Sequence, residues 1–406
     1  MTGHGITRRS VLAVGGTAAV ATLTLSGQAA LGQARGPAVA GQPMPYGVRL
    51  PETAPRARRP DSVGFAIVGL GGYALNQMMP RFEQAERAHI AALVSGSPDK
   101  MREVASAYGV PPQSCYSYEN FAEIASNSEV DAVYIVLPSG LHAEWTERAF
   151  AAGKHVLCEK PMALSSAECE RMIAAARRAD RKLMIAYRSH FEPYNMQAME
   201  LMRQEAVGQL RLIRSEQSYR MGPTSPIENW RANRALAGGG PLEDYGIYGL
   251  QAALYLSGEM PESISATAFR PSGDPRFAEI FAHVSSQLRF PSGAVAQLVA
   301  SYDSAGINST EARGTAGVLT MDPATSYAGN RMILAAGRDR RDFPPVDSTV
   351  QFARQLNHLA DAIRDGAEIK TNGEMGLRDL RLIEAIYASA ETGRTIMLNP
   401  DGTPRN

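Results

Sequence analysis

The sequence predicts an α/β fold in which a doubly wound parallel sheet is followed by a part with mainly antiparallel strands. Apolar runs alternate with helical patterns through the first half of the chain. In the second half, several apolar runs lie close together and turn signals separate them. The length of 406 residues accommodates two domains. Hydrophobic residues make up 44% of the chain, so a large core can be buried and complete disorder is excluded.

Charge and cysteine content exclude two further classes of protein. The 41 lysines and arginines balance 41 aspartates and glutamates, so the basic excess of a general nucleic-acid binder is absent. The three cysteines are Cys115, Cys158 and Cys169, which form neither a disulfide framework nor a paired metal-ligand spacing. We therefore expect no nucleic-acid partner and no metal.

Residues 1–34 are typical of a targeting segment. Arg8 and Arg9 precede an uncharged run over residues 11–31, and small residues follow. This order resembles a twin-arginine export signal and predicts a periplasmic protein. The alternative is a membrane anchor, but the run is weakly apolar and interrupted by glycines. Twin-arginine export moves folded proteins, so it suits a protein that acquires a cytoplasmic cofactor before export.

Residues 35–62 are rich in proline and are not expected to build helix or sheet. The segment is either a flexible linker after the signal or an extended arm that lies on a neighbouring subunit. Proline content alone favours the linker.

A glycine turn predicts nucleotide binding in residues 63–186. An apolar run over 65–68 ends in this turn, and a helical pattern follows that Pro80 would kink or end early. The turn consists of Gly69, Leu70, Gly71, Gly72, Tyr73 and Ala74. Gly69 permits the tight turn, Gly71 allows close approach of a pyrophosphate, and Ala74 allows close packing of helix on strand. The N-terminus of the helix then offers free N–H groups to the phosphates.

The end of the second strand favours NADP over NAD. This strand is expected at 90–94, and Ser95 follows where an NAD-preferring fold usually has an acidic residue. A hydroxyl at Ser95 and an ammonium at Lys100 suit a 2′-phosphate. The alternative is that Ser95 only starts a turn and Lys100 is a solvated helix residue.

The rest of the first half continues the alternation. Strands are expected at 132–137, 155–158 and 182–186, and helices at 143–151 and 165–178. Ligands of doubly wound sheets bind beyond the carboxyl ends of the strands. Two motifs fall there, Leu137-Pro138-Ser139 and Glu159-Lys160-Pro161. Lys160 is either a surface residue or a donor to a sugar hydroxyl that stabilises developing oxyanion charge.

Several motifs together resemble the Gfo/Idh/MocA oxidoreductases, and within them the glucose–fructose oxidoreductase branch. The resemblance runs from about residue 41 to residue 394 and is carried by GLGGYA, VSGSPDK, LPSGLHAE, AGKHVLCEKPMA and GGGPLEDYGIYGL. It implies an N-terminal Rossmann domain over 63–186. It also implies a C-terminal α/β domain over 187–406, whose open, mainly antiparallel sheet covers the nicotinamide and mediates assembly into a dimer or tetramer.

The second half agrees with this expectation on its own residues. Strands are expected at 212–220, 264–269, 281–290, 294–301 and 317–321, and helices at 351–364 and 377–391. The last three strands have the spacing of an antiparallel meander.

The glycine run at 238–240 leads into the predicted catalytic residues. Asp244 and Tyr248 are four residues apart, so they share one face of a helix. The resemblance implies that Tyr248 is the acid/base and that Asp244 positions the sugar. A phenol normally titrates near pKa ~10, and Lys160 together with an oxidised nicotinamide would favour phenolate. The alternative for Tyr248 is a core aromatic.

Further cofactor contacts follow from matched segments. They are Tyr118, Leu137, Pro138, His142, Glu159, Lys160, Arg188, Trp230, Arg231 and Tyr327. The sequence also departs from the branch. Gly72 replaces a basic residue, and Glu243 and Tyr245 alter the surroundings of Asp244, which bears on sugar preference.

These observations predict a periplasmic, NADP-dependent sugar oxidoreductase that keeps its cofactor bound, oxidises an aldose to its aldonolactone and reduces a second sugar. One alternative is an NADP-linked aldose dehydrogenase with exchangeable cofactor. Others are a redox-assisted glycosidase and a non-catalytic sensor. The expected partners are sugars and copies of the same chain, without stable membrane association.

Overall fold

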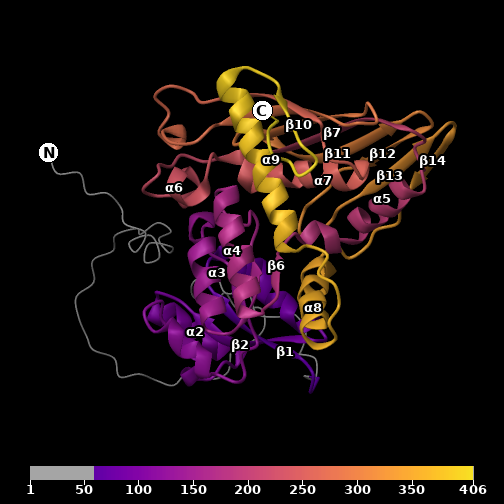
Figure 1. Ribbon diagram of the computed structural model, residues 1–406. Helices are drawn as coiled ribbons and strands as arrows, with labels where there is room; N and C mark the ends of the chain where they lie inside the picture. Colours follow the sequence, from indigo (N-terminus) through magenta and orange to yellow (C-terminus); the bar gives the residue numbers. More distant parts are fainter. Residues whose placement is uncertain (1–58, 406) are drawn as a thin grey trace, which may run out of the picture.

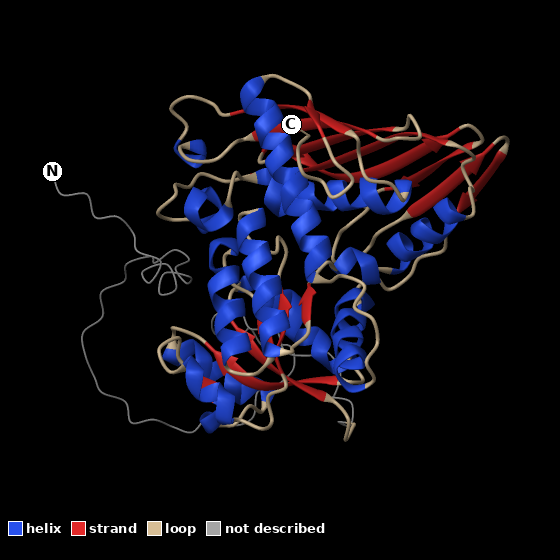
Figure 2. Cartoon of the chain, viewed as in Figure 1, coloured by secondary structure: helices blue, strands red, loops and turns tan. Residues whose placement is uncertain are grey.

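The structure is a computed structural model that describes residues 59–405 (Figure 1). The predicted export signal and residues 35–58 of the Pro-rich segment lie outside the described residues. The described chain forms two sheets, one in each half, with helices packed against both (Figure 2). The predicted α/β fold class is confirmed.

The first sheet is the doubly wound parallel sheet that the sequence predicts. Its six strands lie in the order β3-β2-β1-β4-β5-β6, and every pair is parallel. The strands are β1 (Val63–Val68), β2 (Ala88–Val94), β3 (Cys115–Tyr116), β4 (Ala132–Ile135), β5 (His155–Cys158) and β6 (Leu183–Ile185). The helices between them are α2 (Pro98–Tyr108), α3 (His142–Ala151) and α4 (Ser166–Ala179). Because helices cover both faces, strands such as β1 are buried at every position.

The segment after the glycine turn differs from an ordinary α-helix. It forms a π-helical turn, η2 (Ala74–Met78), followed by a 3₁₀ segment, η3 (Met79–Gln84). Pro80 explains the change, because it has no N–H to donate and its ring clashes with the carbonyl of the preceding turn.

The second sheet has nine strands in the order β14-β13-β12-β11-β7-β10-β9-β8-β15. They are β7 (Leu210–Arg220), β8 (Ser263–Phe269), β9 (His283–Arg289), β10 (Val295–Ser301), β11 (Asp303–Gly314), β12 (Gly317–Met321), β13 (Met332–Ala336), β14 (Asp339–Asp342) and β15 (Ile396–Met397). All neighbours are antiparallel except β7 and β10, which pair in parallel.

The predicted meander is therefore wrong in one part. Strands β9 and β10 are antiparallel neighbours, as expected, but β10 then pairs with β7, and β12 pairs with β11. The sequence does not predict the long strand β11, since most of its residues are polar or small and give no apolar alternation. Both β11 and β7 therefore lie between β12 and β10.

Helices α7 (Ile247–Ser257) and α9 (Gly373–Thr392) pack against one face of this sheet. The other helices of the second half are α5 (Pro193–Arg203), α6 (Arg234–Ala237) and α8 (Val350–Arg364). Short 3₁₀ or π segments are η4 (Pro112–Ser114), η5 (Phe121–Ser126), η6 (Ser139–Leu141), η7 (Arg188–Phe191), η8 (Trp230–Ala232), η9 (Leu242–Gly246) and η10 (Pro275–Phe277). Helix α7 is central and buried around most of its circumference.

The two halves are tied together by the last two helices. Helix α8 comes late in the chain but packs on the first sheet, where Leu356 and Leu359 share a core cluster with Phe65 and Ile67. Helix α9 contacts α4 of the first half and β8 of the second, and Figure 1 shows it extending between them. Among residues 59–405, no helix is long and apolar enough to cross a membrane.

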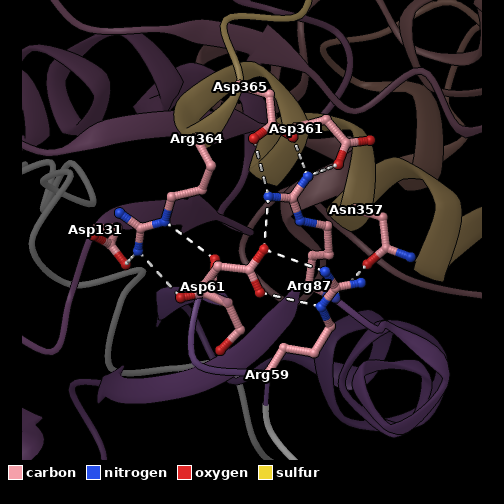
Figure 3. A network of polar contacts seen from close by, with 9 residues as sticks. Arg59, Asp61, Arg87, Asp131, Asn357, Asp361, Arg364 and Asp365 are labelled. Carbon is pink, nitrogen blue, oxygen red and sulfur yellow. Dashed lines mark hydrogen bonds and ion pairs between the residues drawn. The ribbon is translucent and has the colours of Figure 1, made fainter.

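A polar network fastens the C-terminal end of α8 to the start of the Rossmann domain (Figure 3). The Arg87 guanidinium donates to Asp61 at 3.0 Å, to Asp361 at 2.6 Å and also to Asp365. Arg364 donates to Asp131 at 2.7 Å. Arg87 is only 15% exposed, so these ion pairs lie partly shielded from water.

Candidate active site

The glycine turn has the geometry that a dinucleotide requires. Gly69 adopts a φ of +99°, and a Cβ there would lie 2.3 Å from the Val136 carbonyl oxygen. At Gly71 no heavy atom lies within 4 Å of the position that a Cβ would take, so this stretch of backbone is open to a ligand. The turn therefore fits close approach of a pyrophosphate.

The predicted 2′-phosphate residues lie beside this turn. Lys100 donates from Nζ to the Leu70 carbonyl at 3.4 Å, and burial lowers its pKa. Ser95 is buried, and its hydroxyl accepts a hydrogen bond from the Ser97 N–H at 3.2 Å. Tyr118 packs edge-on against Trp145, with ring centroids 5.0 Å apart. Burial raises the pKa of Tyr118 to about 12.

His142 joins the loops that follow β4 and β5. Its ring nitrogens lie 2.9 Å from the Leu137 carbonyl and 2.8 Å from the Pro161 carbonyl. Burial lowers the pKa of His142. His142 therefore links the loop after β4, which contains Leu137 and Pro138, to the loop after β5, which contains Pro161.

Glu159 is directed into the interior. Its carboxylate accepts from the Tyr134 hydroxyl at 2.7 Å and from the Lys160 N–H at 3.2 Å. Burial raises its pKa. These contacts hold the end of β5 and thereby the backbone from which Lys160 extends.

Lys160, Asp244 and Tyr248 come together, as the sequence predicts. Asp244 lies on η9 and Tyr248 in the first turn of α7. Lys160 Nζ donates to the Asp244 carbonyl at 2.6 Å and to its Oδ1 at 3.2 Å. The same nitrogen lies 5.1 Å from the centre of the Tyr248 ring.

Asp244 is fully engaged by three side-chain donors. Besides Lys160, Arg231 Nε donates to Oδ2 at 2.9 Å and the Tyr302 hydroxyl donates to Oδ2 at 2.8 Å. Burial would raise the pKa of Asp244, but the charges of Arg231 and Lys160 hold it well below its usual range. The carboxylate is therefore permanently anionic at neutral pH.

Tyr248 differs from the sequence expectation in its cation. The guanidinium of Arg188 donates from Nε to the Tyr248 hydroxyl at 3.0 Å, whereas Lys160 bonds to Asp244. Burial raises the pKa of Tyr248, and Arg188 opposes that rise. The net shift of the Tyr248 pKa is therefore upward, not the lowering that the sequence predicts from Lys160. The cation at the Tyr248 hydroxyl is Arg188, which the sequence assigns to the cofactor.

Aromatic side chains join this cluster to the glycine turn. Tyr327 is 39% exposed and lies 5.8 Å from Tyr73, between ring centroids, while Arg188 lies 4.6 Å from its ring centre. Arg231 stacks on Trp230 at 4.4 Å. The turn and the Lys160–Asp244–Tyr248 cluster are therefore adjacent, as a reaction between a bound dinucleotide and a sugar requires.

Glu243 does not face Asp244's partners. Its carboxylate accepts from the Gly239 N–H and the Tyr387 hydroxyl, both at 2.6 Å. A Cβ at Gly239 would lie 2.3 Å from that hydroxyl, so the glycine run permits this close approach. Glu243 thus supports the loop rather than the sugar.

Sequence reasoning missed Tyr302 and Gln351. Tyr302 directly follows β10, so a strand-end search could have found it, whereas nothing local to Gln351 indicates its contact with Arg188. Among the described residues, no group of three or more His, Cys, Asp or Glu side chains could hold a metal ion.

Comparison with known proteins agrees with this geometry. Residues 63–187 match the GFO/IDH/MocA oxidoreductase family model with its NAD-binding Rossmann fold, and residues 195–320 match the GFO/IDH/MocA C-terminal domain. The chain belongs to the Gfo/Idh/MocA family. It is an NAD(P)-dependent oxidoreductase that acts on sugars.

Three relatives illustrate the similarity. The aldose–aldose oxidoreductase of Caulobacter crescentus, solved with glycerol, is 46% identical with a TM-score of 0.80, covering 83% of this chain and 100% of that one. The D-xylose 1-dehydrogenase [NADP(+)] of Haloarcula marismortui is 30% identical over 83% of this chain and 93% of its own length. The dTDP-3,4-didehydro-2,6-dideoxy-alpha-D-glucose 3-reductase of Actinomadura kijaniata is 27% identical over 83% and 97%.

Proposed function

We propose that the protein is a periplasmic, NADP-dependent sugar oxidoreductase that oxidises an aldose to its aldonolactone and reduces a second sugar. The observation that carries the proposal is the convergence of Lys160, Asp244 and Tyr248 beside the glycine turn. The 46% identity with an aldose–aldose oxidoreductase over that protein's whole chain supports the same reaction.

The side chains divide the chemistry between them. Lys160 has three N–H donors, of which two contact Asp244, so one remains for a sugar hydroxyl. The Tyr248 oxygen accepts the proton of the C1 hydroxyl as the C1 hydrogen leaves as hydride. When bound, the cofactor would supply the hydride acceptor as NADP⁺ and, for the second sugar, the hydride donor as NADPH. In the second half-reaction the Tyr248 hydroxyl gives its proton to the oxygen of the reduced carbonyl.

The preference for NADP follows from the side chains at the end of β2. Ser95 brings no negative charge to this position, and Lys100 lies at the glycine turn. The names of two relatives, the D-xylose 1-dehydrogenases of Haloarcula marismortui and Haloferax volcanii, also specify NADP. Residues Gly69 to Ala74, the 137–138 segment and Tyr327 would hold the rest of the dinucleotide.

Retention of the cofactor follows from the proposed compartment. Arg8, Arg9 and the uncharged run after them favour export of a folded protein. Free NADP is not expected outside the cytoplasm, so a cofactor that dissociated there would not be replaced. If one sugar is oxidised and a second is reduced on the same bound cofactor, the cofactor is regenerated without leaving the protein.

The second sheet supports assembly into a homo-oligomer through its open face. This face contains a depression of about 670 Å³ lined mostly by polar side chains, among them Arg214, Gln297 and Glu311, together with the apolar Val299. Phe269 and Ile307 are exposed by 59% and 41%. Register places Arg214 opposite Glu311, so the face carries both charge signs and can complement a second copy.

The decisive experiment examines the cofactor of purified, extensively desalted protein. We expect mass analysis and ultraviolet absorbance of the denatured supernatant to show about one NADP per chain. The desalted protein should then convert glucose and xylose to lactone and polyol with no added cofactor. Activity that appears only with added NADP would instead identify an aldose dehydrogenase with exchangeable cofactor; the two relatives above are named as NADP-linked xylose dehydrogenases.

A further inference from the structure

We infer that Arg188 is the residue that stabilises the phenolate of Tyr248, and that Lys160 serves the sugar instead. The inference deepens the proposed function and rests on it. Arg188 acts through Tyr248, so it is a positioning residue rather than a catalytic one.

The geometry of the pair is close and shielded. Arg188 Nε donates to the Tyr248 oxygen at 3.0 Å, and the guanidinium carbon lies 4.6 Å from the ring centre. Only 4% of Arg188 and 9% of Tyr248 are exposed. An ionic contact made in such an environment is much less screened than one at the surface.

Arg188 has no carboxylate partner among residues 59–405. Its other recorded acceptors are neutral: Gln351 Oε1 at 2.8 Å and the carbonyls of Thr325 at 2.6 Å and Ser326 at 3.4 Å. A buried charge without a counterion is costly. The phenolate that Tyr248 becomes when it loses its proton would supply the missing anion.

Lys160 is differently placed because its charge is already paired. Its ammonium contacts Asp244, 3.2 Å from Oδ1, and lies 5.1 Å from the Tyr248 ring centre. The carboxylates of Glu159 and Asp244 disfavour phenolate, and both are near Lys160. The remaining titratable neighbours of Tyr248 are the phenols Tyr73, Tyr245 and Tyr327. Of these neighbouring groups, Arg188 is therefore the cation that bonds to the Tyr248 oxygen.

Gln351 fixes the orientation of the guanidinium. It comes from the second residue of α8 and is fully buried. Its amide nitrogen donates to Ser348, Tyr327 and Ser326 carbonyls, so its oxygen is directed at Arg188. Rotation of Arg188 away from Tyr248 would leave this buried oxygen unpaired.

The test measures Tyr248 without requiring turnover. Protein labelled with ¹³C at tyrosine Cζ is titrated by NMR, and the Tyr248 signal is assigned by its loss in Tyr248→Phe. We expect the titration midpoint to rise by about one to two pH units in Arg188→Met, a ~10–100-fold weaker acid. Arg188→Lys keeps the positive charge, so its Tyr248 midpoint should lie between those of the wild type and Arg188→Met. Arg381→Met is the matched control, because Arg381 is half-buried but paired with Glu170 and Asp401.

Rates then separate this inference from the proposed function. In an active enzyme, the pH at which sugar oxidation levels off should rise in Arg188→Met by the same amount as the NMR midpoint. A shifted midpoint in a protein without sugar turnover would refute the proposed function alone. Equal midpoints in wild type and Arg188→Met, or a wild-type signal still protonated at about pH 11, would overturn the inference.

Discussion

Asp244 organises the active site through three donors rather than through proton transfer. Lys160, Arg231 and Tyr302 occupy both of its carboxylate oxygens. Since its pKa is held below the usual range, it stays ionised throughout the neutral region and is unsuited to act as general acid or base. In the proposed mechanism, Tyr248 is the group in the cluster whose oxygen exchanges a proton with the sugar.

Removal of the Tyr248 hydroxyl should therefore slow the chemical step and leave cofactor binding intact. In Tyr248→Phe, turnover in both half-reactions should fall by ~10²–10⁴-fold, with NADP content unchanged. Tyr194→Phe is the control, because the Tyr194 hydroxyl donates to the Pro344 carbonyl in the loop between β14 and α8. Lys160→Ala should be comparably slow, and the double variant should lose much less than the product of the two. Normal turnover by Tyr248→Phe would exclude Tyr248 from the mechanism.

Glu243 should make stability depend on pH. Burial raises its pKa from 4.5 to about 7, so the folded state binds this proton more tightly than the unfolded chain does. Its contribution to stability is thus fully present below about pH 4.5 and is lost as the pH rises to about 7.

We therefore expect Glu243→Gln to flatten the pH dependence of the unfolding free energy in this window. The change should amount to about 1–3 kcal/mol between the two ends, measured by urea denaturation. The exposed Glu368 supplies the control Glu368→Gln, which should follow the wild-type curve. A Glu243→Gln protein with the full wild-type slope would show that another group is responsible.

At the scale of elements, the sequence predicts whatever leaves a periodic apolar pattern. The buried strands β1, β4 and β5 lie within a few residues of their predicted bounds, because parallel strands covered on both faces are apolar throughout. Strand β11 is not predicted because its own residues form no apolar pattern; its pairing with β7 and β12 places it in the sheet.

Contacts between segments that are distant in the sequence can be predicted only through the family resemblance. Lys160 and Asp244 are 84 positions apart, and no local pattern relates them. The sequence does not predict the contact of Arg188 with Tyr248 at all, since it depends on the relative placement of η7 and α7. Tyr302 and Gln351 enter the site for the same reason: the packing of the second sheet and of α8 places them there.

Helix α8 should depend on Arg87 for its docking. Three carboxylates share this guanidinium, but Asp361 and Asp365 are 40% and 58% exposed, so solvent weakens each pair. Arg87→Met should cost about 1–2 kcal/mol in total and speed hydrogen exchange in the C-terminal half of α8. Arg102→Met, at an exposed pair on α2, should change neither. Equal exchange rates in α8 would mean that its apolar contacts suffice.

At the scale of the whole molecule, the second sheet has one covered and one open face. Alternate residues of its central strands, such as Ile213, Leu288 and Leu298, are buried beneath the helices. Their neighbours Arg214, Gln287 and Gln297 are exposed on the opposite side. A wide sheet face of neutral, charged and scattered apolar residues is suited to contact with its own copy, in which each charge meets its opposite.

A charge at the centre of the open face should separate the subunits. Val299 lines the depression on β10 and is partly buried in the single chain. In a two-fold interface, Val299→Asp would bring two carboxylates into a region with little water, so we expect the mass by light scattering to fall to that of one chain. Ser106→Asp, on the exposed side of α2, is the matched control and should leave the assembly intact. Unchanged mass and NADP content in Val299→Asp would show that the open face is not the interface.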